Sequence, residues 1–266
     1  MLAVLVPLLC YFFVKRSSES AIHMPGHYLA DSVTSTVKKG KQVSDTVWHR
    51  LPEIQLTNQL GQKVSWKDIH GKIIVADFFF THCPTICPAL TVSMKKLQEG
   101  ITNSKRVGDK TPQFLHLISF SIDPERDSVE RLKNWANRFQ VNPDLWWLVT
   151  GEKKGIYDMA INEMKLGIVD GKGIDSEFIH TDHFVLIDTS LHVRGYYHGL
   201  NDSSMRKLSE DIILLTLEKN PNEKGFLEDK LQLLAIVFLI TMAAVGVFLF
   251  VFRKKDKHVG PGLEKK

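Results

Sequence analysis

Two cysteines, Cys83 and Cys87, lie in the run THCPTICP and are the residues that point most directly to chemistry. The chain has 3 cysteines in 266 residues, which is too few for a fold held together by disulfides. A single close pair therefore indicates thiol redox exchange or the binding of a soft metal ion. Two buried cysteines without chemistry are the structural alternative, which this isolated pair disfavours.

The elements predicted around the pair place it where a thiolate is stabilised. The apolar run KIIVADFFF at 72–80 predicts a buried central strand, and residues 88–97 predict a helix. The cysteines fall in the loop between them, at the end of a strand where α/β folds place active sites. Because a helix N-terminus favours negative charge, a thiol there is expected to have a lowered pKa.

The spacing of the cysteines is compatible with two kinds of chemistry. Three residues separate them, Pro84, Thr85 and Ile86, whereas thiol oxidoreductases typically have two. The longer loop can close a disulfide, and it can also hold two sulfurs around one metal ion. Thiolates favour Cu(I) and imidazole is a common copper ligand, so two cysteines and a histidine would suit copper.

Strands and helices alternate along 51–220, which predicts a mixed α/β sheet flanked by helices, with a thioredoxin-like arrangement. A short hairpin is expected around Gly61, and Asp127 or Ser128 is expected to cap a helix. Further strands are expected at 114–122, 145–150, 183–188 and 193–197, and further helices at 128–139, 153–164 and 203–219.

A histidine ligand would have to be one of the 11 in the chain. His180 is the first candidate, because it lies just before a strand that faces the cysteine loop in a thioredoxin-like sheet. His183 and His82 are alternatives whose side chains are expected to point elsewhere. Thioredoxin-like redox enzymes have a cis-proline at this place, and the absence of proline from 174–183 favours a metal over dithiol exchange.

These residues resemble the Sco/SenC family of membrane-anchored, thioredoxin-like copper proteins linked to cytochrome c oxidase assembly. The resemblance covers about 52–219 and rests on three motifs in order: FFFTHCPTICPAL at 78–90, SIDPERDS at 121–128 and IHTDHFVLID at 179–188. It implies copper, as Cu(I) or Cu(II), bound by Cys83, Cys87 and His180. It implies no firm role for Asp123, which we interpret as a residue of strand termination and capping, with support of the metal ligands as the alternative.

Two main functions follow from this set of residues. The first is a copper metallochaperone, with a copper-accepting oxidase subunit and a thiol reductant as partners. The alternative is a thiol–disulfide oxidoreductase acting on a partner's cysteines, with Cys83 and Cys87 as the redox pair but without a need for His180. A copper-responsive interaction module is a third hypothesis. Oxidation of the pair to a disulfide would remove both soft ligands, so redox state could gate copper binding.

Two apolar segments predict attachment to a membrane. Residues 231–251 are long enough to span a bilayer, which needs about 20 apolar residues in a helix. Residues 1–14 are also apolar and are interpreted as a second anchor, with a cleaved signal segment or a lipid on Cys10 as alternatives. The usual family member has one N-terminal anchor, so the C-terminal span leaves open whether the delivery target is the usual one.

Charge sets the expected topology. The formal net charge is +4, and the basic residues after the apolar segment place the tail 252–266 in the cytoplasm. With two anchors, the domain 51–220 and the tether 15–50, which has a possible hairpin, lie on the extracytoplasmic, periplasmic side of the cell membrane. No nucleic acid is expected as a partner, because the basic excess gathers in the tail: Arg253, Lys254, Lys255, Lys257, Lys265 and Lys266.

Overall fold

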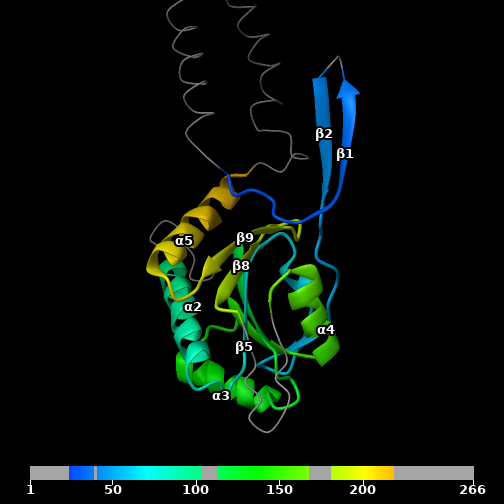
Figure 1. Cartoon of the computed structure of the whole chain (residues 1–266). Coiled ribbons are helices and arrows are strands. Elements are labelled where there is room, and N and C mark those ends of the chain that lie inside the picture. Colours follow the sequence, from blue (N-terminus) through cyan, green and yellow to red (C-terminus); the bar gives the residue numbers. More distant parts are fainter. Residues whose placement is uncertain (1–23, 39–40, 103–112, 168–180, 219–266) are drawn as a thin grey trace, which may run out of the picture. The chain divides into compact units, whose positions relative to one another are not determined.

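The computed structural model describes residues 24–38, 41–102, 113–167 and 181–218 (Figure 1). The two apolar segments, 1–14 and 231–251, and the candidate ligand His180 lie outside these ranges. Within them, no helix combines the length and the apolar character that a membrane crossing requires. The chain divides into two compact units, Met1–Leu217 and Glu218–Lys266, and the elements described below belong to the first.

A seven-stranded mixed sheet forms the centre of this unit, in the order β4-β3-β7-β6-β5-β8-β9. The neighbouring strands β5, β6 and β7 are parallel. Strand β8 runs antiparallel to β5, and β9 runs antiparallel to β8. This is the thioredoxin-like mixed sheet that the sequence predicted. The strands are β3 (Leu56–Asn58), β4 (Lys63–Val64), β5 (Ile73–Phe79), β6 (Leu115–Ser121), β7 (Trp146–Thr150), β8 (His183–Ile187) and β9 (Val193–His198).

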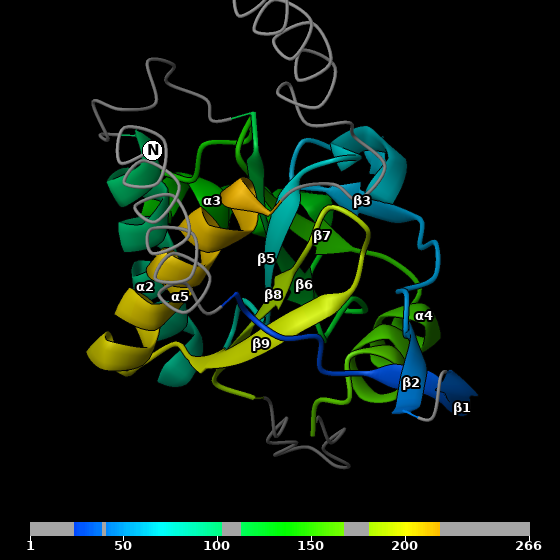
Figure 2. The same cartoon turned by 90° about the horizontal axis from the view of Figure 1, so that it is seen from above.

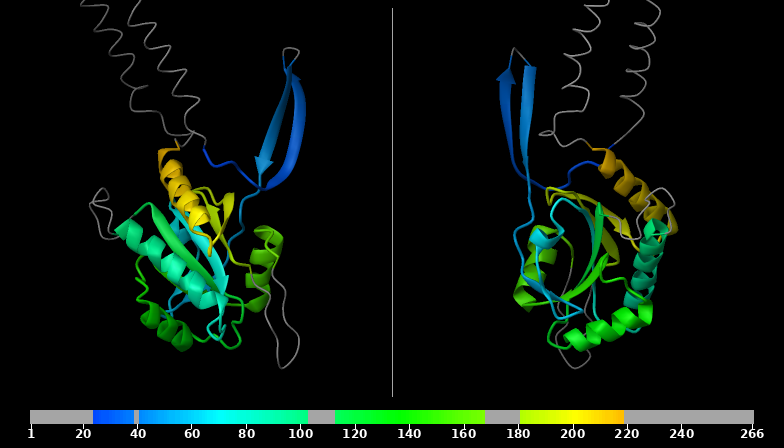
Figure 3. Two further views of the ribbon diagram at one scale, coloured as in Figure 1. Left: turned by 60° about the vertical axis from the view of Figure 1, so that its left-hand side comes forward. Right: turned by 180° about the vertical axis from the view of Figure 1, so that it is seen from behind.

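Helices cover both faces of the sheet (Figures 2 and 3). One face packs against α2 (Ile86–Thr102) and α5 (Asp202–Leu217), and the other against α3 (Val129–Phe139) and α4 (Lys153–Tyr157). A π-helical turn at Asp158–Glu163 continues α4, and a short 3-10 helix occupies Trp66–Ile69. The sheet is therefore sandwiched between two helical layers, which explains why its middle strands are buried and mostly apolar.

The central strand β5 shows how the sequence produces this layering. All of its residues are buried. Successive side chains point to opposite faces, so Ile73 and Val75 join the core under α2 and α5, while Ile74, Ala76 and Phe78 join the other core. Only a continuous apolar run can fill two cores at once, and this explains the lack of polar alternation.

An N-terminal hairpin forms a separate two-stranded sheet from β1 (Ala30–Lys38) and β2 (Lys41–Trp48). Backbone hydrogen bonds join its flanking residues to the β8–β9 hairpin. The N–H of Tyr28 donates to Val193 across 3.1 Å, and the N–H of Leu51 donates to Leu191 across 3.0 Å. The residues on either side of β1 and β2 are thus tied to the main domain.

Of the two residues expected to cap α3, Ser128 does so, accepting a hydrogen bond from the N–H of Arg131, whereas the Asp127 carboxylate is used elsewhere. The helix expected at 88–97 begins earlier and ends later, as α2, and so includes Cys87. Its early start is compatible with Pro88, because the first turn of a helix needs no intrahelical N–H donor.

Candidate metal centre at Cys83 and Cys87

The cysteine loop connects β5 to α2. The N–H of Cys83 donates to the carbonyl of Phe80 across 3.3 Å, which turns the chain immediately after the strand. Cys87 is the second residue of α2 and therefore lies in its first turn. The strand end thus positions one sulfur and the helix start positions the other.

The two thiols are close and differ in their access to solvent. The N–H of Cys87 donates to the Sγ atom of Cys83 across 3.4 Å, and both cysteines are free thiols. Cys83 is 6% exposed and Cys87 is 0% exposed. A partner that comes from solvent therefore meets Cys83 first, with Cys87 behind it.

The electrostatic environment also separates the two thiols. Burial raises the pKa of Cys83, but backbone N–H groups of Cys87, Thr85 and Ile86 directed at its sulfur outweigh burial, so the net pKa is lowered. Burial raises the pKa of Cys87 strongly, and the neighbouring charges of Cys83 and Asp77 raise it further. Cys83 consequently ionises more readily than Cys87, and it is the better candidate for the thiolate of the pair.

Asp127, in the segment between β6 and α3, fixes the start of the cysteine loop. Its buried carboxylate accepts hydrogen bonds from the N–H of Thr81 at 3.1 Å and from the hydroxyl of Thr81 at 2.5 Å. The hydroxyl of Ser121 donates to the same carboxylate across 2.6 Å. Because Phe79 pairs with Ser121 in the parallel β5–β6 ladder, the SIDPERDS motif lies directly beside the cysteine motif.

Asp123 contributes a second carboxylate at this edge, where the sequence favoured strand termination and capping over a role in supporting the cysteine site. Its backbone carbonyl does accept from Arg126 and Asp127 in the turn after β6. Its buried Oδ2 atom lies 2.8 Å from Nε of Arg126 and 3.3 Å from Nε2 of His82. The side chain thus holds the residue next to Cys83, a role that only the spatial pairing of the two motifs could reveal.

The three candidate histidines are placed differently. His82 is directed to Asp123, as above, and its ring also contacts Phe80 at a centroid distance of 4.8 Å. His183 begins β8, with its ring 4.0 Å from that of His198. The structure does not describe His180, but Val185 pairs with Ala76, so the start of β8 comes to the edge where β5 leads into the cysteine loop.

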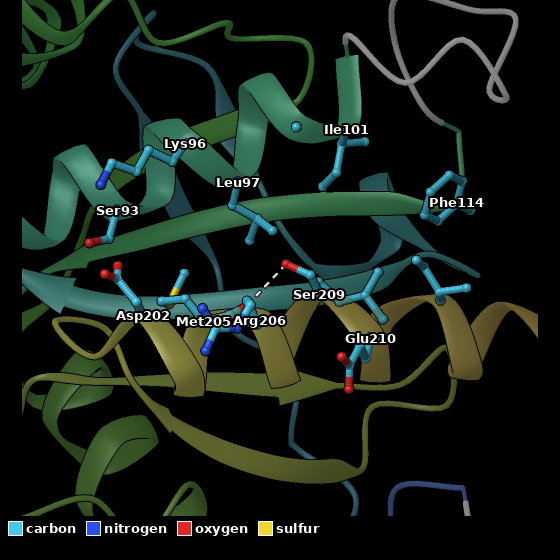
Figure 4. A pocket seen from close by; sticks show the side chains of 13 residues that line it. Ser93, Lys96, Leu97, Ile101, Phe114, Asp202, Met205, Arg206, Ser209 and Glu210 are labelled. Carbon is cyan, nitrogen blue, oxygen red and sulfur yellow. Dashed lines mark hydrogen bonds between the residues drawn. The ribbon is translucent and has the colours of Figure 1, made fainter. Parts of the chain in front are cut away.

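A groove of about 630 Å³ lies between α2 and α5, away from the cysteine loop (Figure 4). Its floor is apolar and includes Leu97, Ile101 and Phe114, and charged side chains such as Lys96 and Arg206 stand along it. Neither Cys83 nor Cys87 lines this groove. The groove is thus separate from the cysteine pair.

Comparison with known proteins shows that the sequence of this chain is similar to a family of proteins and to several of its members. The family model described as SCO1/SenC matches residues 49–213. The "SCO1 protein homolog" of Bacillus subtilis is 29% identical over 174 residues, which cover 65% of this chain and 86% of that protein.

Solved structures agree with the match. A SCO1/SenC family lipoprotein from Bacillus anthracis has a TM-score of 0.56 and 30% identity, covering 63% of this chain and 95% of the other. BsSco, described as a member of the Sco family of cytochrome c oxidase assembly proteins with a disulfide switch, has a TM-score of 0.54 and 28% identity, covering 65% and 98%. Arabidopsis thaliana ScoI, solved with copper bound, shares the fold at a TM-score of 0.50 and 22% identity, covering 61% and 97%. The family model spans the sheet, the cysteine loop and both carboxylates beside it, and the chain therefore belongs to the SCO1/SenC family.

Proposed function

We propose that this protein is a membrane-anchored copper metallochaperone, which binds copper and passes it to a copper-accepting subunit of a respiratory cytochrome c oxidase. The observation that carries the proposal is the position of two free thiols, joined by the Cys87 N–H to Cys83 Sγ hydrogen bond, at the start of α2. Family membership supports the choice of copper and of the oxidase, since ScoI was solved with copper and BsSco is described as an oxidase assembly protein.

The donor set fits a soft ion. Two thiolates favour Cu(I), and His180 would add an imidazole from the segment that leads into β8. Binding requires the reduced, deprotonated thiols, so copper must take the place of the Cys87 proton. A disulfide between Cys83 and Cys87 would remove both sulfurs as ligands, and a thiol reductant is therefore the second expected partner.

The test is copper binding by the reduced full-length chain in detergent, measured by competition with a chromogenic Cu(I) chelator. We expect one Cu(I) per chain, and loss of this binding in Cys83→Ser, Cys87→Ser and His180→Ala. Cys10→Ser and His70→Ala are the matched controls, because Cys10 is remote in the sequence and His70 is exposed on the loop before β5. Unchanged affinity in His180→Ala would remove that residue from the ligand set.

A thiol–disulfide oxidoreductase is the second candidate, favoured by the opposite pKa shifts of the two cysteines. The Cys83 thiolate would attack a partner's disulfide, forming a mixed disulfide and releasing one partner thiol. Cys87 would then lose its proton and attack Cys83, forming the internal disulfide and releasing the second thiol. A thiol reductant would restore the pair. This activity should survive His180→Ala, whereas copper binding should not.

The proposed location is the cell membrane, with the domain on the periplasmic side and the tail 252–266 in the cytoplasm. The apolar segments 1–14 and 231–251 support it. Alkaline phosphatase fused after residue 220 should be active, because the enzyme folds only outside the cytoplasm. Fusion after residue 266 should be inactive, and the reverse pattern would contradict this topology.

A further inference from the structure

A second cluster of metal-ligating side chains lies on the β8–β9 hairpin. Asp182 and His183 stand at the start of β8, and His198 is the last residue of β9. His183 and His198 are direct partners in the antiparallel register, which brings their rings to a centroid distance of 4.0 Å. Two histidines and a carboxylate therefore converge at one end of the hairpin.

The spacing of the ligand atoms suits a single ion. One carboxylate oxygen of Asp182 lies 3.0 Å from Nδ1 of His183, and the other lies 3.3 Å from Nδ1 of His198. One ligand atom from each residue can be chosen so that all three lie within 4.8 Å of one another. Neighbouring ligand atoms bound about 2.0 Å from a tetragonal Cu²⁺ ion stand roughly 2.8 Å apart, so small side-chain movements would complete the site.

The chemistry of these donors differs from that of the cysteine pair. Two imidazoles and a carboxylate, without sulfur, favour a borderline divalent ion, and Cu²⁺ binds such sites most tightly among the first-row divalent metals. All three side chains are partly accessible, at 38% for Asp182, 31% for His183 and 59% for His198. An ion can thus reach the cluster from solvent without opening the fold.

A comparable cluster at the other end of β8 contains an ion pair that would compete with a bound metal ion. His27, Asp188 and His192 also converge, but the guanidinium of Arg194 lies 3.0 Å from the Asp188 carboxylate and already compensates its charge. Among the described residues, the ion pairs of Asp182 are with His183 and His198 alone. No described lysine or arginine therefore competes with a metal ion for the Asp182 carboxylate in an ion pair.

The cluster lies at the same edge of the sheet as the cysteine loop. β8 starts where the antiparallel β5 ends, because Val185 pairs with Ala76. The N–H of Gly199, next to His198, donates to the carbonyl of Asp182 across 2.7 Å and ties the two strand ends together. A Cβ atom on Gly199 would lie only 2.5 Å from Leu90, which follows Cys87 by three residues in α2.

We propose that Asp182, His183 and His198 form a second metal site, which takes Cu²⁺ beside the cysteine pair. The existence of the site is independent of the proposed function, while copper as its ion in the cell rests on that function. A site of this kind would hold divalent copper near the centre that the thiolates form for Cu(I).

The experiment uses the full-length chain in detergent with Cys83→Ser and Cys87→Ser, which removes the thiolates. Cu²⁺ is added as its chloride and followed by calorimetry and electron paramagnetic resonance. We expect one bound Cu²⁺ with nitrogen hyperfine structure, and a dissociation constant raised at least about 10-fold by Asp182→Asn, His183→Ala or His198→Ala. His192→Ala should leave the dissociation constant unchanged.

The outcomes separate this proposal from the function. Unchanged Cu²⁺ affinity in His198→Ala would overturn it, as would loss of binding in His180→Ala alone. His198 is the most exposed of the three residues, so its replacement leaves the fold intact even if a change at His183 does not. Failure of Cu(I) binding by the chain with intact cysteines would remove the proposed function and leave this site standing.

Discussion

The backbone N–H of Cys87 donates a hydrogen bond to the Sγ atom of Cys83 across 3.4 Å. This contact makes the two sulfurs neighbours and also unequal, because the donated N–H stabilises negative charge on Cys83. The first turn of α2 provides it, and a helix N-terminus has such N–H groups available. The same geometry serves a thiolate that attacks a disulfide and a thiolate that binds a metal.

The difference in pKa between Cys83 and Cys87 predicts the order in which the two thiols react. In the reduced, metal-free Cys10→Ser variant, iodoacetamide should modify Cys83 before Cys87. The lowered pKa of Cys83 means that its reaction should reach half of its maximal rate at a lower pH than that of an ordinary thiol. Peptide mass spectrometry over a pH series measures both rates. Faster modification of Cys87 would show that the assignment of the thiolate is wrong.

Asp127→Asn should loosen the cysteine loop. The change removes the charge that accepts hydrogen bonds from Thr81 and Ser121, and charged hydrogen bonds contribute about 1.5–3 kcal/mol each. We expect the free energy of unfolding to fall by about 2–4 kcal/mol in chemical denaturation, with weaker Cu(I) binding. Asp144→Asn is the control, because Asp144 is exposed and should lose little stability. Equal losses in both variants would argue against the anchoring role.

Asp77 should make stability depend on pH. Burial raises the pKa of this carboxyl to about 7, against an opposing hydrogen bond with Ser119. Between about pH 4 and 7 the folded chain keeps a proton that the unfolded chain releases, so the contribution of Asp77 to stability is present at low pH and declines as pH rises. Three pKa units correspond to at most about 4 kcal/mol.

Asp77→Asn tests this dependence, because an amide does not titrate. The gain in free energy of unfolding over the parent chain should grow from pH 4 to 7 and then stay constant. Measuring the difference between the two chains cancels His116, whose pKa burial lowers to about 3 and whose contribution falls as pH drops below about 6.5. A difference that does not vary with pH would contradict the raised pKa of Asp77.

His82→Ala should leave the number of bound Cu(I) ions unchanged. The Nε2 atom of His82 is directed to Asp123, so its loss removes an interaction at the loop and no proposed ligand. Stability should fall by about 1 kcal/mol or less, as expected for a partly exposed ion pair. Chelator competition and denaturation measure the two quantities on the same preparation. Loss of Cu(I) binding by this variant would make His82 a ligand in place of His180.

Much of the architecture follows from local patterns. The apolar runs predict β5 and β6 because strands covered on both faces have mostly apolar side chains. The cysteine spacing and the following proline indicate a loop that enters a helix, and α2 does begin between the two cysteines. The sequence also singles out His180, which lies outside the described residues and stays a prediction.

Tertiary structure alone decides which polar groups meet. Asp127 looks like a helix cap in the sequence, yet its carboxylate bonds to Thr81, which is far away along the chain. His183 and His198 become neighbours through the register of β8 and β9. Local sequence patterns predict which residues are buried and where the chain turns, because both properties depend on residues that are close in the sequence. Strand register depends on the packing of the whole sheet, and it determines which distant side chains share a site.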